Sequence, residues 1–279
     1  MDRIPFGVSQ LDELVGGGAP AGSVVLLAGE AGAGAREFGF TSAMLGGLAE
    51  TDPDAFRLHY GDLAEAAALP PEIHYVSMTA ATADLRAEMS LAFEDDLVEA
   101  GLGGVTFCDL SAEYFQLSPV PREWYAGSRG TISELADGEQ RRDVIESLAD
   151  YFDEHAEGSL LVVDSLTDLV SVAGGRLHEW RDVVYLLKGL RKASRRWGGL
   201  VLIHVAREAI PDQRMGDLMT SVDGTMLFEW TGEGSERKRS LVVKEFRGVL
   251  SQLEDEDIVR FETEIREGGF DITNVRKLR

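Results

Sequence analysis

A glycine-rich stretch near the N-terminus carries the residues best placed to do chemistry. Residues 24–38, VVLLAGEAGAGAREF, run from an apolar segment through a glycine-rich loop into an expected helix. Backbone N–H groups of such a loop, together with the N-terminus of the helix, can hold phosphate oxygens without any side chain. The phosphate-loop pattern G-x-x-x-x-G-K-[ST] aligns with Gly29 and Gly34, with Gly32 between them. The sequence therefore predicts a phosphate cradle in this loop.

The two side chains that complete such a loop are replaced. Ala35 stands at the position of the lysine that contacts the β and γ phosphates, and Arg36 stands at the position of the Ser or Thr that binds Mg²⁺. Arg36 has two alternatives. It can curl back to a phosphate, or it can face solvent in the first helical turn, because it lies about 100° around the helix from the lysine position. No lysine lies close by in sequence, since the first in the chain is Lys188.

The elements that must position this loop follow from the apolar pattern. Strands are expected where nearly every residue is apolar, and helices where apolar residues recur every three or four positions. Repeated β-α-β units with apolar strands predict an α/β fold, a mainly parallel sheet with helices on both faces. The expected strands are residues 23–28, 73–78, 105–110, 159–163 and 200–205, and the expected helices cover about residues 35–48, 85–97, 144–152 and 178–197.

The C-terminal part of the chain has a different pattern. Residues 224–230 and 240–246 flank a Gly-rich turn, and residues 258–265 and 270–275 flank a second turn at Gly268 and Gly269. These pairs predict two hairpins, so the sheet should end in antiparallel strands. We expect one domain, residues 1–279, with an elaborated loop at about residues 111–136.

Composition limits the partners and the compartment. The formal net charge is −22, which opposes binding to DNA or to an anionic membrane. Only five of the 27 basic residues are lysines, and an acidic, lysine-poor surface suits a halophilic, archaeal cytoplasm, where salt screens charge within a few Å. The N-terminus lacks a signal-peptide layout and no apolar run could span a membrane, so a cytoplasmic protein without membrane insertion is expected. The single cysteine, Cys108, excludes an intrachain disulfide.

Several segments together resemble the KaiC-like family of the RecA superfamily. Residues 6–34, FGVSQLDELVGGGAPAGSVVLLAGEAGAG, match its Gly-x-x-x-Leu-Asp stretch and its GG-x-P-x-G turn before the first strand. In SLLVVDSLTDL, Asp164 ends a Walker B-like strand and Ser165 follows. The segments SVDGTMLFEW and LVVKEFRG extend the resemblance over nearly the whole chain. The resemblance implies a RecA-like P-loop core, and active members of the family hydrolyse ATP, often in hexameric rings with ATP between subunits.

The chain departs from this family at two further places. In the family, the phrase V-T-F-E-E carries two glutamates that polarise the attacking water. The corresponding phrase here is Val-Ser-Met-Thr-Ala, with Thr79 and Ala80 at the two glutamate positions, so no general base stands there. The family phrase K-x-R-G, which reaches the nucleotide of a neighbouring subunit, corresponds to Glu245-Phe-Arg247-Gly. Arg247 is kept for a contact in trans, while Glu245 reverses the charge of the lysine. Asp164 can orient a residual Mg²⁺ or a water molecule, or it can cap the loop after its strand.

These departures predict a degenerate ATPase, a non-hydrolysing KaiC-like paralogue that acts as a regulatory or scaffolding protein. By family analogy it would work in signalling or motility. No catalytic residue and no metal site are predicted; ATP or ADP is the candidate cofactor, and Mg²⁺ is not expected to bind with it. A protein partner or a homo-oligomer is expected. The vestigial nucleotide site comprises Gly29, Gly32, Gly34, Arg36, Asp164 and Ser165, with Arg247 as the contact in trans.

Two alternatives stay open. An ATP-binding switch or weak ATPase of the KaiC/RecA type would use the backbone cradle and Arg36. A recombinase-like, DNA-associated protein is suggested by a basic stripe at helical spacing, although a solvated helix face paired with local acids explains the same pattern. The five histidines show no metal-ligand spacing. The basic stripe comprises Lys188, Arg191, Lys192, Arg195 and Arg196.

Overall fold

The computed structural model describes residues 2–116, 118–125, 144–172, 180–232, 237–250, 253 and 258–277. Three sequence predictions fall partly outside this range. Residues 117 and 126–136 of the expected elaborated loop, residues 178–179 of the expected helix over 178–197 and residues 233–236 of the first expected hairpin turn lie outside the described residues. The described part of that loop contains a short helix, α6 (Ser111–Phe115), and a 3₁₀ turn at Arg122–Trp124.

The predicted strands form, and most begin or end within two residues of the expected positions. The strands are β1 (Arg3–Ile4), β2 (Ala19–Pro20), β3 (Ser23–Gly29), β4 (Ile73–Ser77), β5 (Val105–Asp109), β6 (Leu160–Asp164), β7 (Leu200–Ala206), β8 (Gly224–Thr231), β9 (Lys238–Phe246), β10 (Ile258–Arg266) and β11 (Gly269–Lys277).

Helices connect these strands, as the α/β pattern predicts. Besides α6 they are α1 (Ser9–Leu14), α2 (Ala35–Thr51), α3 (Pro53–Tyr60), α4 (Thr82–Ala92), α5 (Asp95–Gly103), α7 (Val144–His155), α8 (Leu166–Val172), α9 (Trp180–Trp197) and α10 (Asp212–Ser221). Among these described helices none has both the length and the apolar content needed to cross a membrane.

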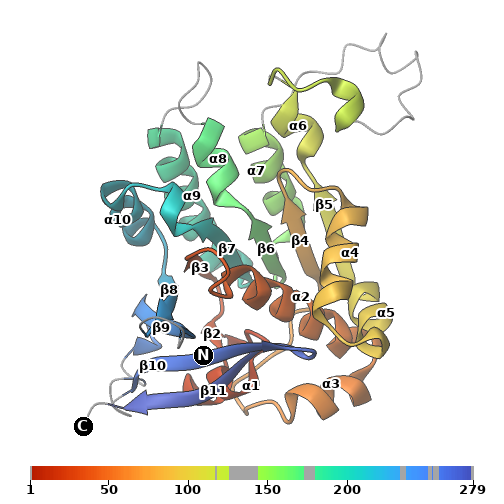
Figure 1. Cartoon of the computed structure of the whole chain (residues 1–279), viewed down its shortest axis with the longest axis vertical. Helices are drawn as coiled ribbons and strands as arrows, with labels where there is room; N and C mark the ends of the chain where they lie inside the picture. Colours follow the sequence, from red (N-terminus) through yellow and green to blue (C-terminus); the bar gives the residue numbers. More distant parts are fainter. Residues whose placement is uncertain are drawn as a thin grey trace.

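Within the described residues the main sheet has nine strands in the order β11-β10-β9-β8-β3-β7-β6-β4-β5. Strands β8, β3, β7, β6, β4 and β5 run parallel, and β9, β10 and β11 continue the sheet in antiparallel pairs. The prediction of a mainly parallel sheet that ends in antiparallel strands is therefore confirmed. β3, which leads into the glycine-rich loop, lies near the middle of the sheet (Figure 1).

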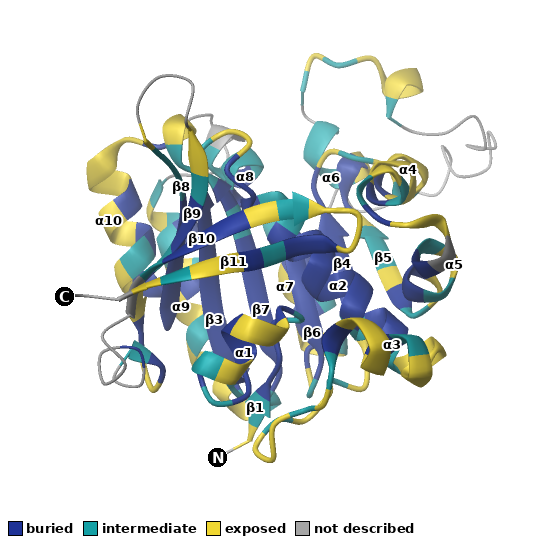
Figure 2. Cartoon of the chain, turned by 60° about the horizontal axis from the view of Figure 1, so that its bottom comes forward, coloured by how far each residue is buried: buried dark blue, intermediate teal, exposed yellow. Residues whose placement is uncertain are grey.

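Each face of the sheet carries its own core, because successive side chains of a strand point to opposite faces. Val25 and Leu27 of β3 pack with α2, α3, α4 and α5, and Val24 and Leu26 pack with α7, α8, α9 and α10. Strands β3, β4 and β6 are buried along their whole length and β7 along most of it, as Figure 2 shows by their dark blue colour, whereas the edge strand β5 is partly exposed. Burial of both faces explains why these strands are nearly continuous apolar runs in the sequence.

The C-terminal hairpin of β10 and β11 lies across α2, as Figures 1 and 2 both show. The ring centroid of Phe270 lies 5.3 Å from that of Phe38 on α2, and the Phe270 N–H donates to Oγ1 of Thr41 at 2.8 Å. The hairpin tip also reaches the segment after α4, where the Glu94 N–H donates to the carbonyl oxygen of Glu267. Residues near the C-terminus thus hold the helix that follows the glycine-rich loop.

One predicted helix is divided in the structure. Leu85, Met89, Phe93 and Leu97 are all buried, as their spacing predicted, but Phe93 is extended between α4 and α5. Phe93 forms an isolated β-bridge with Gly268 at the hairpin tip. The sequence prediction of one continuous helix is therefore wrong at this point, because a contact made by a segment far along the chain interrupts it.

Candidate functional site

The glycine-rich loop connects the carboxyl end of β3 to the start of α2, as predicted. Gly34 is the N-cap of α2 with a φ of 107°, a left-handed conformation that glycine adopts without strain. A Cβ at Gly29 would lie 2.5 Å from the Cβ of Ala35, so only glycine fits at the end of the strand. The loop therefore has the backbone requirements that its glycines indicated, and Gly32 (φ 71°) lies between these two positions.

The start of α2 presents N–H donors toward the loop. The carbonyl oxygen of Gly34 accepts the first helical hydrogen bond, from the Phe38 N–H at 2.9 Å. Among the described residues, no acceptor pairs with the N–H groups of Gly34, Ala35 or Arg36. Such donors, with the positive end of the helix dipole, form an anion-binding geometry. Within the described residues, the N–H groups that a phosphate cradle would use are thus left unpaired.

Side chains from three other elements hold the loop. The Ala31 N–H donates to Oε2 of Glu208 at 3.2 Å, in the 3₁₀ turn Arg207–Ala209 that follows β7. The indole N–H of Trp230 donates to the Ala31 carbonyl oxygen at 3.0 Å, and Nε of Arg239 donates to the Gly32 carbonyl oxygen at 2.8 Å. The Arg239 guanidinium also lies 4.7 Å from the Trp230 ring centroid. The loop is therefore fixed to strands β8 and β9, and a carboxylate lies beside one of its N–H groups.

Arg36 points to Asp164 at the end of β6. Its Nε donates to Oδ2 of Asp164 at 2.7 Å, and its Nη1 lies 2.7 Å from Oε2 of Glu88 on α4. The guanidinium carbon also lies 5.1 Å from the Phe40 ring centroid. Burial disfavours the charge on Arg36, but the carboxylate of Asp164 outweighs it and raises the pKa of the guanidinium. The side chain of Arg36 is 36% exposed and its guanidinium is paired with two carboxylates, a contact that neither of its two sequence alternatives included.

Asp164 is held as an anion by three partners. Besides Arg36, the hydroxyl of Tyr75 on β4 donates to Oδ2 at 2.9 Å, and Nδ1 of His204 on β7 lies 3.1 Å from Oδ1. Burial alone would raise the pKa of Asp164, but the hydrogen bond to His204 and the charge of Arg36 lower it to about 2. Burial and the charge of Asp164 raise the pKa of Tyr75, so its hydroxyl stays a donor. Asp164 is thus part of a charged network across four elements.

Ser165 has a local role in this structure. Its N–H and its hydroxyl both donate to Oδ2 of Asp168 in the first turn of α8, at 3.2 and 2.9 Å. The peptide bond between Asp164 and Ser165 is cis. Ser165 therefore lies next to the network and makes its hydrogen bonds to the following helix.

The end of β4 carries no carboxylate at the two positions where the resembling family has glutamates. The N–H groups of Thr79 and Ala80 instead donate to Oγ of Ser77, at 3.4 and 3.0 Å. The carboxylate that reaches the site from this part of the chain is Glu88, one helix later, and it is paired with Arg36.

Arg247 lies apart from this site in its own chain. It follows β9, whose last residue Phe246 pairs with Gly224, while Gly29 at the loop pairs with Phe228. Arg247 is exposed at the opposite end of the sheet. Any contact between Arg247 and a loop site would therefore involve a second copy of the chain.

The basic stripe of α9 is partly neutralised. Nε of Arg191 lies 2.9 Å from Oδ1 of Asp223, and Nη2 of Arg195 lies 3.5 Å from the same atom. Asp223 also accepts from the Val24 N–H, so these arginines help to join α9 to the start of β3. Pairing with a local acid therefore accounts for two of the five basic residues.

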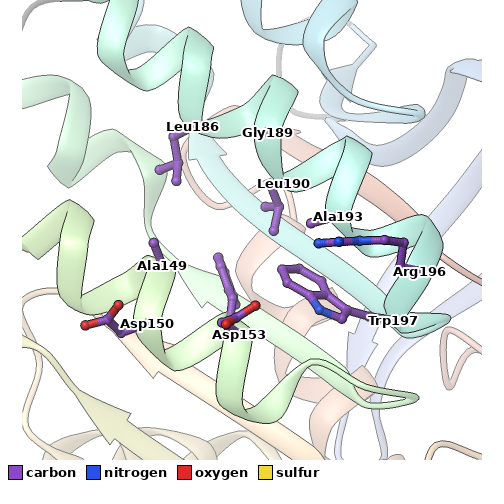
Figure 3. A pocket seen from close by; sticks show the side chains of 10 residues that line it. Ala149, Asp150, Asp153, Leu186, Gly189, Leu190, Ala193, Arg196 and Trp197 are labelled. Atoms are coloured by element: carbon purple, nitrogen blue, oxygen red, sulfur yellow. The ribbon is translucent and has the colours of Figure 1, made fainter.

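An apolar pocket of about 400 Å³ lies between α7 and α9 (Figure 3). Phe152, Leu190 and Trp197 supply its apolar walls, and Asp153 and Arg196 lie at its edge. None of the predicted site residues lines it. The pocket is therefore separate from the glycine-rich loop.

Sequence reasoning missed several residues of this site. Tyr75, His204, Glu88 and Glu208 contact the loop network but lie in segments without a motif, and Trp230 ends the segment SVDGTMLFEW without having been identified as a contact of the loop. One sequence signal pointed to the ion pair: Arg36 replaces the hydroxyl residue of the loop, while Asp164, the Walker B-like aspartate, is kept. The other contacts depend on which strands are neighbours.

Comparisons with known proteins support the fold. No protein-family model matches the sequence, and no curated protein matches it. Among solved structures, the chain is similar to the KaiC-like protein PH0186 from the hyperthermophilic archaeon Pyrococcus horikoshii OT3, with a TM-score of 0.60 and 18% identity over 98% of this chain and 99% of that chain. At this identity the match shows a common KaiC-like, RecA-type fold, and the predicted fold class is confirmed.

Proposed function

We propose that this chain is a non-hydrolysing KaiC-like protein that acts through protein contacts, as a regulatory or scaffolding subunit. The observation that carries the proposal is the ion pair between Arg36 and Asp164, with Nε and Oδ2 2.7 Å apart. The pair joins the two positions that would bind Mg²⁺ in an active P-loop enzyme, the residue after the loop lysine and the acid at the end of the Walker B strand.

A guanidinium cannot do what Mg²⁺ does in phosphoryl transfer. The metal ion bridges the β and γ phosphate oxygens and neutralises the charge that develops between them. Arg36 places a positive charge against Asp164 but offers no coordination site, and both of its described ion pairs are with protein carboxylates. The pair therefore stabilises the fold at the expense of metal binding.

The other replacements act in the same direction. Ala35 lacks the positive charge with which the loop lysine contacts the β and γ phosphates. Thr79 and Ala80 leave no general base to activate the attacking water. Glu208 adds a carboxylate 3.2 Å from the Ala31 nitrogen, where it would repel a γ phosphate. Each change weakens a different contribution to catalysis, so the proposal does not depend on one substitution.

The second candidate is an ATP-binding switch without turnover. It is favoured by the N–H groups of Gly34, Ala35 and Arg36, which have no acceptor among the described residues. Binding through these groups would not require Mg²⁺, because a helix N-terminus holds phosphate directly. The DNA-associated alternative has less support, since Asp223 pairs with Arg191 and Arg195 of the basic stripe. The halophilic cytoplasm, the homo-oligomer and the role in signalling or motility are part of the proposal on family analogy and composition alone.

The test measures turnover and binding in the same preparations. We expect purified protein to release no phosphate from ATP above the level of Asp164→Asn, with and without Mg²⁺. In the double variant Ala35→Lys with Arg36→Thr, we expect Mg²⁺-dependent thermal stabilisation by ATP, because a bound ligand stabilises the folded state. That variant should still show no turnover, because Thr79 and Ala80 remain.

The matched control is Arg57→Thr on α3, whose exposed pair with Asp62 lies away from the loop. It should respond to ATP as the wild type does. Sustained phosphate release by the wild type that disappears in Asp164→Asn would contradict the proposal. A thermal shift of the wild type by ATP, equal with and without Mg²⁺, would select the switch over the scaffold.

A further inference from the structure

A cluster of metal-ligating side chains lies at the amino edge of the parallel sheet, opposite the loop. Glu72 directly precedes β4, His74 is the second residue of β4, and His155 is the last residue of α7. One ligand atom from each of the three residues lies within 4.8 Å of the others. Eighty residues of sequence separate the histidines, so their spacing along the chain gave no signal of a common site.

The orientation of His74 is fixed by its two ring nitrogens. Nε2 lies 3.1 Å from Oε2 of Glu72, and Nδ1 lies 2.7 Å from the hydroxyl of Tyr151 on α7. The His155 ring centroid lies 5.0 Å from that of His74 and 4.4 Å from that of Tyr151. Nε2 of His74 therefore faces Glu72, and a hydrogen-bonding partner holds its second nitrogen, an arrangement that metal-ligating histidines commonly have.

We propose that Glu72, His74 and His155 bind one divalent transition-metal ion of the Zn²⁺ class, with a fourth position open to water. Two imidazoles and a carboxylate are donors that suit Zn²⁺ and its neighbours in the first transition row rather than Mg²⁺ or Ca²⁺. Ligand atoms around a tetrahedral Zn²⁺ are separated by about 3.3 Å, given bonds of about 2.0–2.1 Å. The pair of Glu72 and His74 is already close to that separation.

The exposure of the three side chains allows an ion to enter. The side chain of His74 is 3% exposed, that of His155 is 31% exposed and that of Glu72 is 62% exposed. His155 is the last residue of α7, and its ligand atom lies within 4.8 Å of those of Glu72 and His74.

Bound metal would join β4 to the end of α7. The start of β4 and the end of α7 would then be linked through the ion as well as through Tyr151. The site lies at the other end of the sheet from Arg36 and Asp164, so this proposal is independent of the nucleotide site. The alternative explanation is a purely structural cluster, in which Glu72 and Tyr151 satisfy the hydrogen bonds of His74.

The experiment uses tag-free protein that has been treated with chelator and dialysed, with Co²⁺ and Zn²⁺ as probes. We expect one equivalent of Co²⁺ to give the visible absorption of a four-coordinate site, and Zn²⁺ to displace it. His155→Gln and Glu72→Gln should each weaken Zn²⁺ binding by more than about tenfold, and Tyr151→Phe by about tenfold, the smaller loss typical of an outer-shell partner. His59→Gln on α3, an exposed histidine elsewhere, is the matched control.

Thermal unfolding distinguishes a variant that has lost the metal site from one that fails to fold. Zn²⁺ should raise the melting temperature of the wild type and of His59→Gln, and should leave His155→Gln unchanged if that variant melts normally without metal. Equal Zn²⁺ affinity in the wild type, Glu72→Gln and His155→Gln would overturn the proposal. Absence of any Co²⁺ spectrum in the wild type would do the same and would leave the structural cluster as the explanation.

Discussion

Asp164 and Asp12 are both buried aspartates, 8% and 1% exposed, and they lie in very different surroundings. Asp164 at the end of β6 contacts a guanidinium, an imidazole and a phenol. Asp12 in α1 accepts only from neutral donors, which are the N–H groups of Phe6 and Gly7 at 2.8 and 3.1 Å and the Tyr60 hydroxyl at 3.0 Å.

The pKa values of the two aspartates differ accordingly. Burial raises the pKa of Asp12 to about 7, although its three donors oppose the rise. The pKa of Asp164 falls to about 2, because the hydrogen bond to His204 and the charge of Arg36 outweigh burial. Neutral hydrogen bonds therefore do not hold a buried carboxylate charged here, whereas a nearby cation does. For Asp164 the cation is Arg36 in the first turn of α2, and it acts together with the hydrogen bond to His204.

Among the changes that test the contrast between Asp164 and Asp12, removal of the Arg36 cation should have the largest effect on stability. We expect Arg36→Met to lower the free energy of unfolding at pH 7 by about 2–3 kcal/mol, because it leaves Asp164 buried beside His204 and Tyr75 alone. The value lies below that of a fully buried pair since 36% of the Arg36 side chain is exposed. Urea unfolding measures it.

The control for this prediction is Arg57→Met, whose pair with Asp62 is 3.9 Å long and largely exposed. It should cost roughly 0–1 kcal/mol, as surface pairs do. Equal losses in the two variants would mean that Arg36 contributes no more than a surface arginine and would remove the contrast with Asp12.

Acid should remove the contribution of Asp164. A carboxyl group whose folded pKa is lowered contributes stability above its unfolded pKa, and that stability is lost as the pH falls through the folded pKa. With a folded pKa of about 2, we expect the stability difference between the wild type and Asp164→Asn to shrink by about 2 kcal/mol from pH 5 to pH 2. Urea unfolding across this range measures it, and a constant difference would contradict the assignment of a charged Asp164.

Asp12 should show a change of opposite sign and at higher pH, and between pH 6 and pH 8 only the last part of that change remains. Its folded pKa is raised above the unfolded value, so its contribution is complete in acid and is lost as the pH rises through about 7. We expect wild-type stability to fall by about 1 kcal/mol from pH 6 to pH 8 relative to Asp12→Asn, which cannot ionise. Denaturation in urea at both pH values measures it. An unchanged difference would show that the neutral donors suffice to keep Asp12 charged.

Much of the fold could be predicted, because the signals were local. The apolar runs gave β3, β4, β6 and β7 almost to the residue, and the glycine turn at Gly268 and Gly269 gave the last hairpin. The helix expected across Leu85 and Leu97 was wrong at Phe93, because its buried periodicity continued while its backbone paired with Gly268. Periodicity predicts which face is buried, and it cannot detect a strand-like contact made by a segment far away in the chain.

The candidate site could be predicted only in part. Gly29, Gly34 and Asp164 lie at the carboxyl edge of the sheet, as their motifs indicated. The partner of Arg36 could not be read from the sequence, because two opposite alternatives fitted the same helical position. Tyr75 and His204, which contact Asp164, come from β4 and β7, the two strands that flank β6 in the sheet, and in the chain β5 lies between β4 and β6.

The sequence by itself determined the α/β fold and the backbone shape of the loop. It also shows directly that the lysine, the hydroxyl residue and the two glutamates are replaced. These follow from residue type and local spacing, which act over a few positions of the chain. Only the tertiary structure decided that Arg36 binds Asp164, that Asp12 has neutral partners, and that His74 lies beside His155. The physical reason is that burial and charge pairing depend on which strands and helices become neighbours, and those contacts join residues far apart in sequence.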